Sequence, residues 1–161
     1  MSETEKPQND NTVQANASTE APKPTQTFQN SPEDAKYLVA EDNTVNQKIL
    51  GIMFGRMELN YHAAWNGQQA LDMYKANPER CRLILMDTSM PVMDGLKAST
   101  LIRQYEKENG LLPAIIVGMT AQFIGLESEE QRLKDKYGMD TTLSKPVRPQ
   151  HFKELVDSYP V

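Results

Sequence analysis

Residues 83–95 read Leu-Ile-Leu-Met-Asp-Thr-Ser-Met-Pro-Val-Met-Asp-Gly, and this stretch decides the fold. Four apolar residues lead directly into Asp87, and Pro91 and Asp94-Gly95 then interrupt the chain. A short apolar run bounded by turn residues is typical of a buried strand that ends in a loop. Asp87 is therefore predicted at the carboxyl end of a strand, where open α/β sheets bind ligands. Taken alone, Asp87 is better explained as a cap of the turn, and only the other strands change that interpretation.

Four further units of strand and helix surround this one. The predicted strands cover residues 37–40, 60–65, 83–87, 113–119 and 141–144. Each is followed by apolar residues at helical spacing, and strands that alternate with helices indicate a parallel sheet covered on both faces. Right-handed crossovers favour a doubly wound order 2-1-3-4-5, with the ligand crevice between strands 1 and 3. The predicted fold class is therefore α/β with a five-stranded parallel sheet.

The first predicted helix has two local signals. Residues 44–47, Thr-Val-Asn-Gln, have the spacing of a capping box. The apolar residues share one helical face, as in a helix packed on a sheet. These residues are Val45, Ile49, Ile52, Met53 and Met57.

Composition divides the chain of 161 residues into two parts. Residues 1–34 are rich in Asn, Gln, Thr, Pro and Glu, so this segment buries too little apolar surface to order itself and is expected to be a disordered polar tail. Residues 35–161 are expected to form one domain.

Charge and cysteine usage exclude several classes of protein. A net charge of −5 without a Lys/Arg-rich run excludes a nucleic-acid footprint, and no apolar stretch reaches the roughly 18 residues that a membrane helix needs. Cys81 is the only cysteine, so it cannot form an intramolecular disulfide, and it is predicted to be a small core residue. No secretory signal is recognisable, which favours a cytoplasmic location, with the nucleus as the other compartment.

Side chains with complementary chemistry end four of the five strands. Glu41-Asp42 follow the first strand and Asp87 ends the third, while Thr120 and Lys145 close the fourth and fifth. Three neighbouring carboxylates repel one another unless a cation neutralises them, and Mg²⁺ suits such oxygen ligands. A hydroxyl and an ammonium beside them suit a phosphoryl group, and an Asp is able to accept one as an acyl phosphate. Each residue singly has an ordinary role as a cap or a surface charge, but those roles do not explain the joint arrangement.

Together these motifs resemble the receiver domain of two-component response regulators, especially the receivers of hybrid histidine kinases. The resemblance covers about residues 36–158. It rests on Glu41-Asp42-Asn43, Met86-Asp87 with the Met90–Gly95 loop, Met119-Thr120-Ala121 and Leu143-Ser144-Lys145-Pro146.

The resemblance implies a flavodoxin-like (βα)5 fold and a role for each residue at the predicted edge. Asp87 is the implied phospho-acceptor. Glu41, Asp42, Asp87 and the backbone carbonyl of Ser89 are the implied ligands of Mg²⁺. Thr120 is expected to follow the phosphoryl group in the conformational switch, and Lys145 is expected to contact that group. The resemblance also implies that the Lys145-Pro146 peptide bond is cis.

Two departures from the family pattern concern the conformational readout. Many receivers carry Tyr or Phe three residues before the lysine, where this chain has Thr142. The segment between Thr120 and Lys145 is also slightly longer than usual, through residues 123–126. Both bear on the output more than on the phosphorylation chemistry.

The implied function is a phospho-accepting module of a histidine-to-aspartate phosphorelay, which is not an enzyme because it catalyses only its own phosphorylation and dephosphorylation. The implied donor is a histidine kinase, a histidine phosphotransfer protein or both. Because the last predicted helix lies close to Val161, output is expected to pass through a downstream protein.

Three alternatives remain at this stage. The first is a phosphoryl shuttle or sink without output switching. The second is an aspartate-nucleophile phosphohydrolase of the haloacid-dehalogenase type, which needs a second Asp two positions after the nucleophile, where this chain has Ser89. The third is a flavodoxin-like cofactor binder, which Glu41-Asp42 disfavour because they repel a phosphate in the absence of metal.

Overall fold

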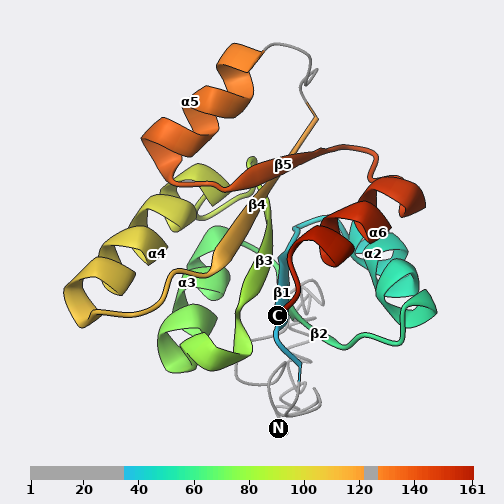
Figure 1. Cartoon of the computed structure of the whole chain (residues 1–161), viewed down its shortest axis with the longest axis horizontal. Coiled ribbons are helices and arrows are strands. Elements are labelled where there is room, and N and C mark those ends of the chain that lie inside the picture. The colour runs from blue at the N-terminus through green and yellow to red at the C-terminus, as the bar shows by residue number, and fades with distance from the viewer. Residues whose placement is uncertain (1–34, 122–126) are drawn as a thin grey trace, which may run out of the picture.

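The computed structural model describes residues 35–121 and 127–161, in which five parallel strands form one sheet. The predicted tail over residues 1–34 and the longer segment at residues 123–126 lie outside the described residues. The sheet order is β2-β1-β3-β4-β5, as predicted (Figure 1). The strands are β1 (Tyr37–Ala40), β2 (Tyr61–Ala64), β3 (Leu83–Asp87), β4 (Ile115–Thr120) and β5 (Thr141–Ser144).

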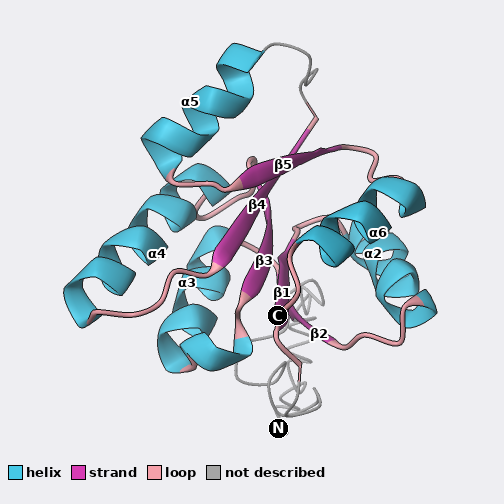
Figure 2. Cartoon of the chain, in the orientation of Figure 1, coloured by secondary structure: helices cyan, strands magenta, loops and turns pink. Residues whose placement is uncertain are grey.

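Helices cover both faces of this sheet. They are α2 (Thr44–Arg56), α3 (Gly67–Ala76), the 3₁₀ turn η1 (Pro78–Arg80), α4 (Gly95–Asn109), α5 (Glu127–Tyr137) and α6 (Pro149–Ser158). Helices α2 and α6 lie on one face, and α3, α4 and α5 on the other (Figure 2). Every residue of β3 is buried, because the central strand of a doubly covered parallel sheet contacts a core on each side. None of the described helices is long and apolar enough to cross a membrane.

Several helix ends follow the sequence signals. Asp94 caps α4 by accepting a hydrogen bond from the Lys97 N–H, and Pro149 is the first residue of α6. Gly110 and Gly138 follow α4 and α5 with φ of 61° and 70°, the left-handed conformation that ends a helix. Local chemistry therefore set these boundaries.

The capping box predicted for the first helix was wrong. The N-cap of α2 is Asn43, whose Oδ1 accepts hydrogen bonds from the N–H groups of Val45 and Asn46 at 2.9 and 3.1 Å. Thr44 is already the first helical residue, so its hydroxyl is not at the cap position. The Gln47 side chain is buried and reaches the strand ends instead of the helix start.

The apolar face predicted for α2 is for the most part not the face that packs on the sheet. Val45, Ile49 and Ile52 are 61%, 42% and 57% exposed. The sheet instead buries the face that carries Gln47 and Phe54, and the Phe54 ring contacts those of Tyr37, Tyr61 and Phe152 at centroid distances of 5.4, 4.7 and 4.8 Å. Helix α2 has apolar residues on two faces, and the aromatic cluster determines which one is buried.

The start of α4 is packed tightly beneath the carboxyl end of β3. A Cβ added at Gly95 would overlap the carbonyl oxygen of Asp87 and lie 2.7 Å from Cγ of Met86. Helix α4 therefore approaches Asp87 this closely only because residue 95 has no side chain.

We predict that Gly95→Ala lowers the free energy of unfolding by about 1–3 kcal/mol, the usual cost of forcing an extra carbon into a packed site. Gly55→Ala is the matched control, since a Cβ there meets no atom within 4 Å and Gly55 lies inside α2. That control should instead be stabilised by roughly 0.5–1 kcal/mol. Urea unfolding of both variants tests this, and equal stability changes would contradict the packing argument.

Candidate functional site

The carboxyl edge of the sheet brings three acidic side chains together. Ala40 pairs with Met86 across β1 and β3, so Glu41 follows β1 at the level of Asp87, the last residue of β3. One carboxylate oxygen each from Glu41, Asp42 and Asp87 lies within 4.8 Å of the other two. Glu41 and Asp87 are buried and Asp42 is exposed. The sequence predicted this convergence from strand order alone.

Lys145 supplies a cation to this cluster. Its Nζ lies 2.6 Å from Oδ2 of Asp87 and 2.7 Å from Oε2 of Glu41. The residue directly follows β5, and its backbone N–H donates to the Thr120 carbonyl at 2.9 Å, which extends the pairing of β4 and β5 by one residue. The bond to Pro146 is cis, as the resemblance implied.

Burial and charge work in opposite directions at this ion pair. Burial raises the pKa of the Glu41 carboxyl above its ordinary value, although hydrogen bonds from Lys145 and from the Asn43 N–H oppose the rise. Burial alone would lower the pKa of Lys145, but its hydrogen bonds to Asp87 and Glu41 outweigh burial and raise it. The two carboxylates thus stabilise the charged ammonium form of Lys145.

Three converging carboxylates also fit a hard divalent cation. Mg²⁺ prefers oxygen ligands and usually keeps several waters in its shell, and exposed Asp42 leaves one side of the cluster open to solvent. The ligand atoms of the cluster are all carboxylate oxygens, a set that favours Mg²⁺ over softer metals. Glu41, Asp42 and Asp87 are therefore able to hold it.

The remaining predicted residues lie at the same edge. The Ser89 N–H donates to Oδ1 of Asp87 at 3.0 Å, so both carboxylate oxygens of Asp87 have partners. Thr120 is buried at the end of β4, one residue beyond Met119, which pairs with Asp87. The structure thus brings every predicted site residue to one edge of the sheet.

Two further buried residues, Cys81 and Gln47, differ in their relation to the site. Cys81 is fully buried, which confirms it as a core residue, and burial raises the pKa of its thiol to about 12, which disfavours the thiolate. The sequence indicates Gln47 only as part of a capping box, but its side-chain NH₂ donates hydrogen bonds to the strand ends beside Glu41. A polar residue on the buried face of a helix indicates a specific hydrogen-bonding role, but only the fold shows which face is buried.

We predict that Lys145→Met lowers the free energy of unfolding in EDTA by about 2 kcal/mol, because hydrogen bonds to buried charged groups contribute on that order. Added MgCl₂ should restore part of this loss by returning positive charge to Glu41 and Asp87. Lys153→Met is the control, since Lys153 forms an ion pair of equal length, 2.6 Å, with Asp157 at the exposed surface. Thermal melts in EDTA and in MgCl₂ test this, and the idea fails if both variants melt alike.

Comparisons with known proteins place this geometry in a family. Residues 37–157 match the model of the response regulator receiver domain. The chain is 34% identical over 127 residues to hybrid signal transduction histidine kinase I of Dictyostelium discoideum, which covers 76% of this chain and 7% of that protein. It is 32% identical over 133 residues to the osmolarity two-component system protein SSK1 of Saccharomyces cerevisiae, covering 68% of this chain and 18% of that protein. The chain therefore spans only a small part of the length of these relatives.

Solved structures agree. The receiver domain of Ssk1, crystallised with the histidine phosphotransfer signaling protein Ypd1 of Saccharomyces cerevisiae, superposes with a TM-score of 0.70 at 32% identity, covering 78% of this chain and 88% of that one. The receiver domain of sensor histidine kinase PA1611 of Pseudomonas aeruginosa, with a magnesium ion coordinated in its active-site cleft, gives 0.62 at 28% identity, covering 76% and 94%. By family match, sequence identity and fold, this chain belongs to the response regulator receiver domains of two-component and phosphorelay signal transduction.

Proposed function

We propose that this receiver accepts a phosphoryl group on Asp87 from a phosphohistidine, with Mg²⁺ held by Glu41, Asp42, Asp87 and the backbone carbonyl of Ser89. The observation that carries the proposal is the convergence of three carboxylate oxygens within 4.8 Å beside the Lys145 ammonium. Bound Mg²⁺ supplies positive charge that stabilises the transferring phosphoryl oxygens. The family is not classed as an enzyme, so the reaction changes only the receiver and its donor.

The transfer is a displacement at phosphorus. A carboxylate oxygen of Asp87 forms the new O–P bond as the P–N bond of the phosphohistidine breaks, and the electron pair of that bond stays on the imidazole nitrogen. Lys145, already 2.6 Å from Asp87, is placed to pair with a phosphoryl oxygen, and the Thr120 hydroxyl is proposed to donate to another. The product is an acyl phosphate on Asp87.

The exposed apolar residues of α2 support a protein donor. Val45, Ile49 and Ile52 lie on the helix that begins two residues after Asp42, and an exposed apolar face of this kind marks an interaction surface. We propose that a histidine phosphotransfer protein or a histidine kinase domain docks on this face and so presents its phosphohistidine to Asp87. The relative Ssk1, crystallised with Ypd1, supports a donor of the same kind.

A small hollow connects this face to the acidic cluster. Its lining includes the apolar residues Ile49, Pro146 and Val147 as well as Glu41 and Lys145. Apolar and charged residues thus adjoin on the surface that a donor would cover.

The proposed site of action is the cytoplasm or the nucleus.

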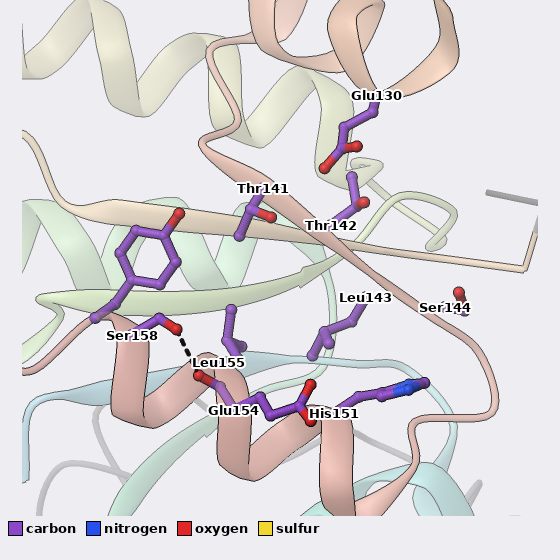
Figure 3. A pocket seen from close by; sticks show the side chains of 10 residues that line it. Glu130, Thr141, Thr142, Leu143, Ser144, His151, Glu154, Leu155 and Ser158 are labelled. Carbon is purple, nitrogen blue, oxygen red and sulfur yellow. Dashed lines mark hydrogen bonds between the residues drawn. The ribbon is translucent and has the colours of Figure 1, made fainter. Parts of the chain in front are cut away.

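The face over β5 favours a shuttle or sink as the second candidate function. A groove of about 450 Å³ lies between α5 and α6 over β5, and Thr142 lines it together with Glu130, Leu143 and His151 (Figure 3). A switch needs contacts that differ between its two states, and a threonine methyl group buries far less apolar area than the aromatic ring of many relatives. Such a receiver is proposed to pass its phosphoryl group on, or to be read by a downstream protein beside Asp87.

We predict that acetyl phosphate with MgCl₂ adds one phosphoryl group to the chain, seen by intact-mass measurement and lost in base, because an acyl phosphate is labile there. Asp87→Asn should take up none, and EDTA added beforehand should prevent the reaction. Asp157→Asn, at an exposed position on α6, is the control and should react as the unaltered chain does. Uptake by Asp87→Asn at the unaltered rate would refute the assignment.

We predict that Ile52→Ser slows transfer from a phosphorylated histidine phosphotransfer protein of the same cell about tenfold, since losing one apolar contact of about 1.4 kcal/mol has that effect. Phosphorylation by acetyl phosphate, which needs no docking, should be unchanged. Leu112→Ser is the control, because Leu112 is 81% exposed but precedes β4 at the opposite edge of the sheet. Equal rates for both variants with the protein donor would argue against docking on α2.

A further inference from the structure

Gln47 is a polar residue on the buried face of α2. The residue is only 4% exposed, and its Nε2 lies 3.1 Å from the Val39 carbonyl oxygen, 3.3 Å from that of Glu41 and 3.0 Å from that of Ala64. Burying an amide costs free energy unless hydrogen bonds compensate. This residue therefore contributes something that an apolar core residue would not.

The surroundings determine how the amide is oriented. Carbonyl oxygens only accept hydrogen bonds, so the NH₂ group and not the Oε1 must face them. Two N–H hydrogens are shared among three carbonyls, and Oε1 accepts no hydrogen bond from the described residues. The side chain is thus used as a donor alone.

The three carbonyls belong to the carboxyl ends of β1 and β2. Val39 and Ala64 lie in these strands, and Glu41 directly follows β1. The Ala64 oxygen also accepts the Glu41 N–H at 3.1 Å. The backbone of Glu41 is therefore held on its N–H side by β2 and on its carbonyl side by Gln47.

Glu41 is followed directly by Asp42, so the same peptide unit determines how both acidic side chains point. Asn43 then caps α2, which carries Gln47 on its first turn. The chain thus closes a short loop from β1 to α2, and the Gln47 amide joins its two ends. Without that amide, the Glu41 N–H would still be held by Ala64, but the Glu41 carbonyl would lose its hydrogen bond to the side chain of α2.

We propose that Gln47 is a positioning residue, which holds the β1 end so that the carboxylates of Glu41 and Asp42 converge on Asp87. The proposal rests on the proposed function, because it concerns the same magnesium site. Groups that orient metal ligands without touching the metal typically contribute 10–100-fold to metal affinity.

The test uses Mn²⁺ as the probe, counted by electron paramagnetic resonance, with Mg²⁺ as competitor. Gln47→Met, which keeps the volume but removes the donors, should weaken Mn²⁺ binding about tenfold. Gln47→Asn, whose shorter amide does not reach all three carbonyls, should weaken it in the same direction and carries the test if the Met variant does not fold. Denaturation midpoints in EDTA are measured alongside.

Ser99→Ala is the matched control. Ser99 is fully buried, and its hydroxyl donates to the Tyr137 carbonyl oxygen at 2.7 Å on the opposite face of the sheet. This variant should lose stability in EDTA while keeping the Mn²⁺ dissociation constant of the unaltered chain. A purely structural role for Gln47 predicts the same behaviour for its variants, so an unchanged dissociation constant in folded Gln47→Met or Gln47→Asn overturns the proposal.

Mn²⁺ binding by the unaltered chain separates failure of the magnesium site from failure of the role of Gln47. If the unaltered chain binds no Mn²⁺ that Mg²⁺ displaces, the magnesium site and the role of Gln47 both fall. If the unaltered chain binds Mn²⁺ and the Gln47 variants bind it equally well, only the role of Gln47 falls.

Discussion

The interaction on which this site depends is the contact of one ammonium with two buried carboxylates. Lys145 lies between Glu41 and Asp87, residues that are 58 positions or more from it in the chain. Buried carboxylates this close are unfavourable without positive charge, since desolvation and mutual repulsion both oppose ionisation. The end of β5 must therefore reach the ends of β1 and β3. The parallel sheet makes this possible, because every strand ends at the same edge.

The same requirement explains why the cluster is suited to phosphoryl transfer. A site that already stabilises dense negative charge with a placed ammonium needs little rearrangement when a phosphoryl group arrives. The tight packing of α4 under Asp87 and the hydrogen bond from the Ser89 N–H restrict this side chain further. Asp87 is thus held both by residues close to it in the chain, Ser89 and Gly95, and by the distant Lys145.

Helix α2 has one face buried against the sheet and one apolar face exposed to solvent. Its inner face packs Phe54 on an aromatic cluster and sends the Gln47 amide to the strand ends, while Val45 and Ile52 remain exposed. The proposed docking face and the proposed positioning residue are therefore on opposite sides of one helix. A donor that binds the outer face would contact the element that also orients the acidic turn.

The sequence by itself determined the order of strands, most helix ends and the edge at which Asp87 and Lys145 meet. These features are local or follow from chain topology: apolar runs end at turn residues, and parallel strands share an edge. The tertiary structure alone decided which face of α2 is buried, because apolar residues occur on two of its faces and the choice depends on rings contributed by β1, β2 and α6. The cap of α2 is by contrast a local contact: Asn43 accepts hydrogen bonds from residues two and three positions later, so Gln47 has no capping role. The partners of Gln47 and of Lys145 come from distant strands, and no periodicity along the chain encodes contacts between segments that only folding brings together.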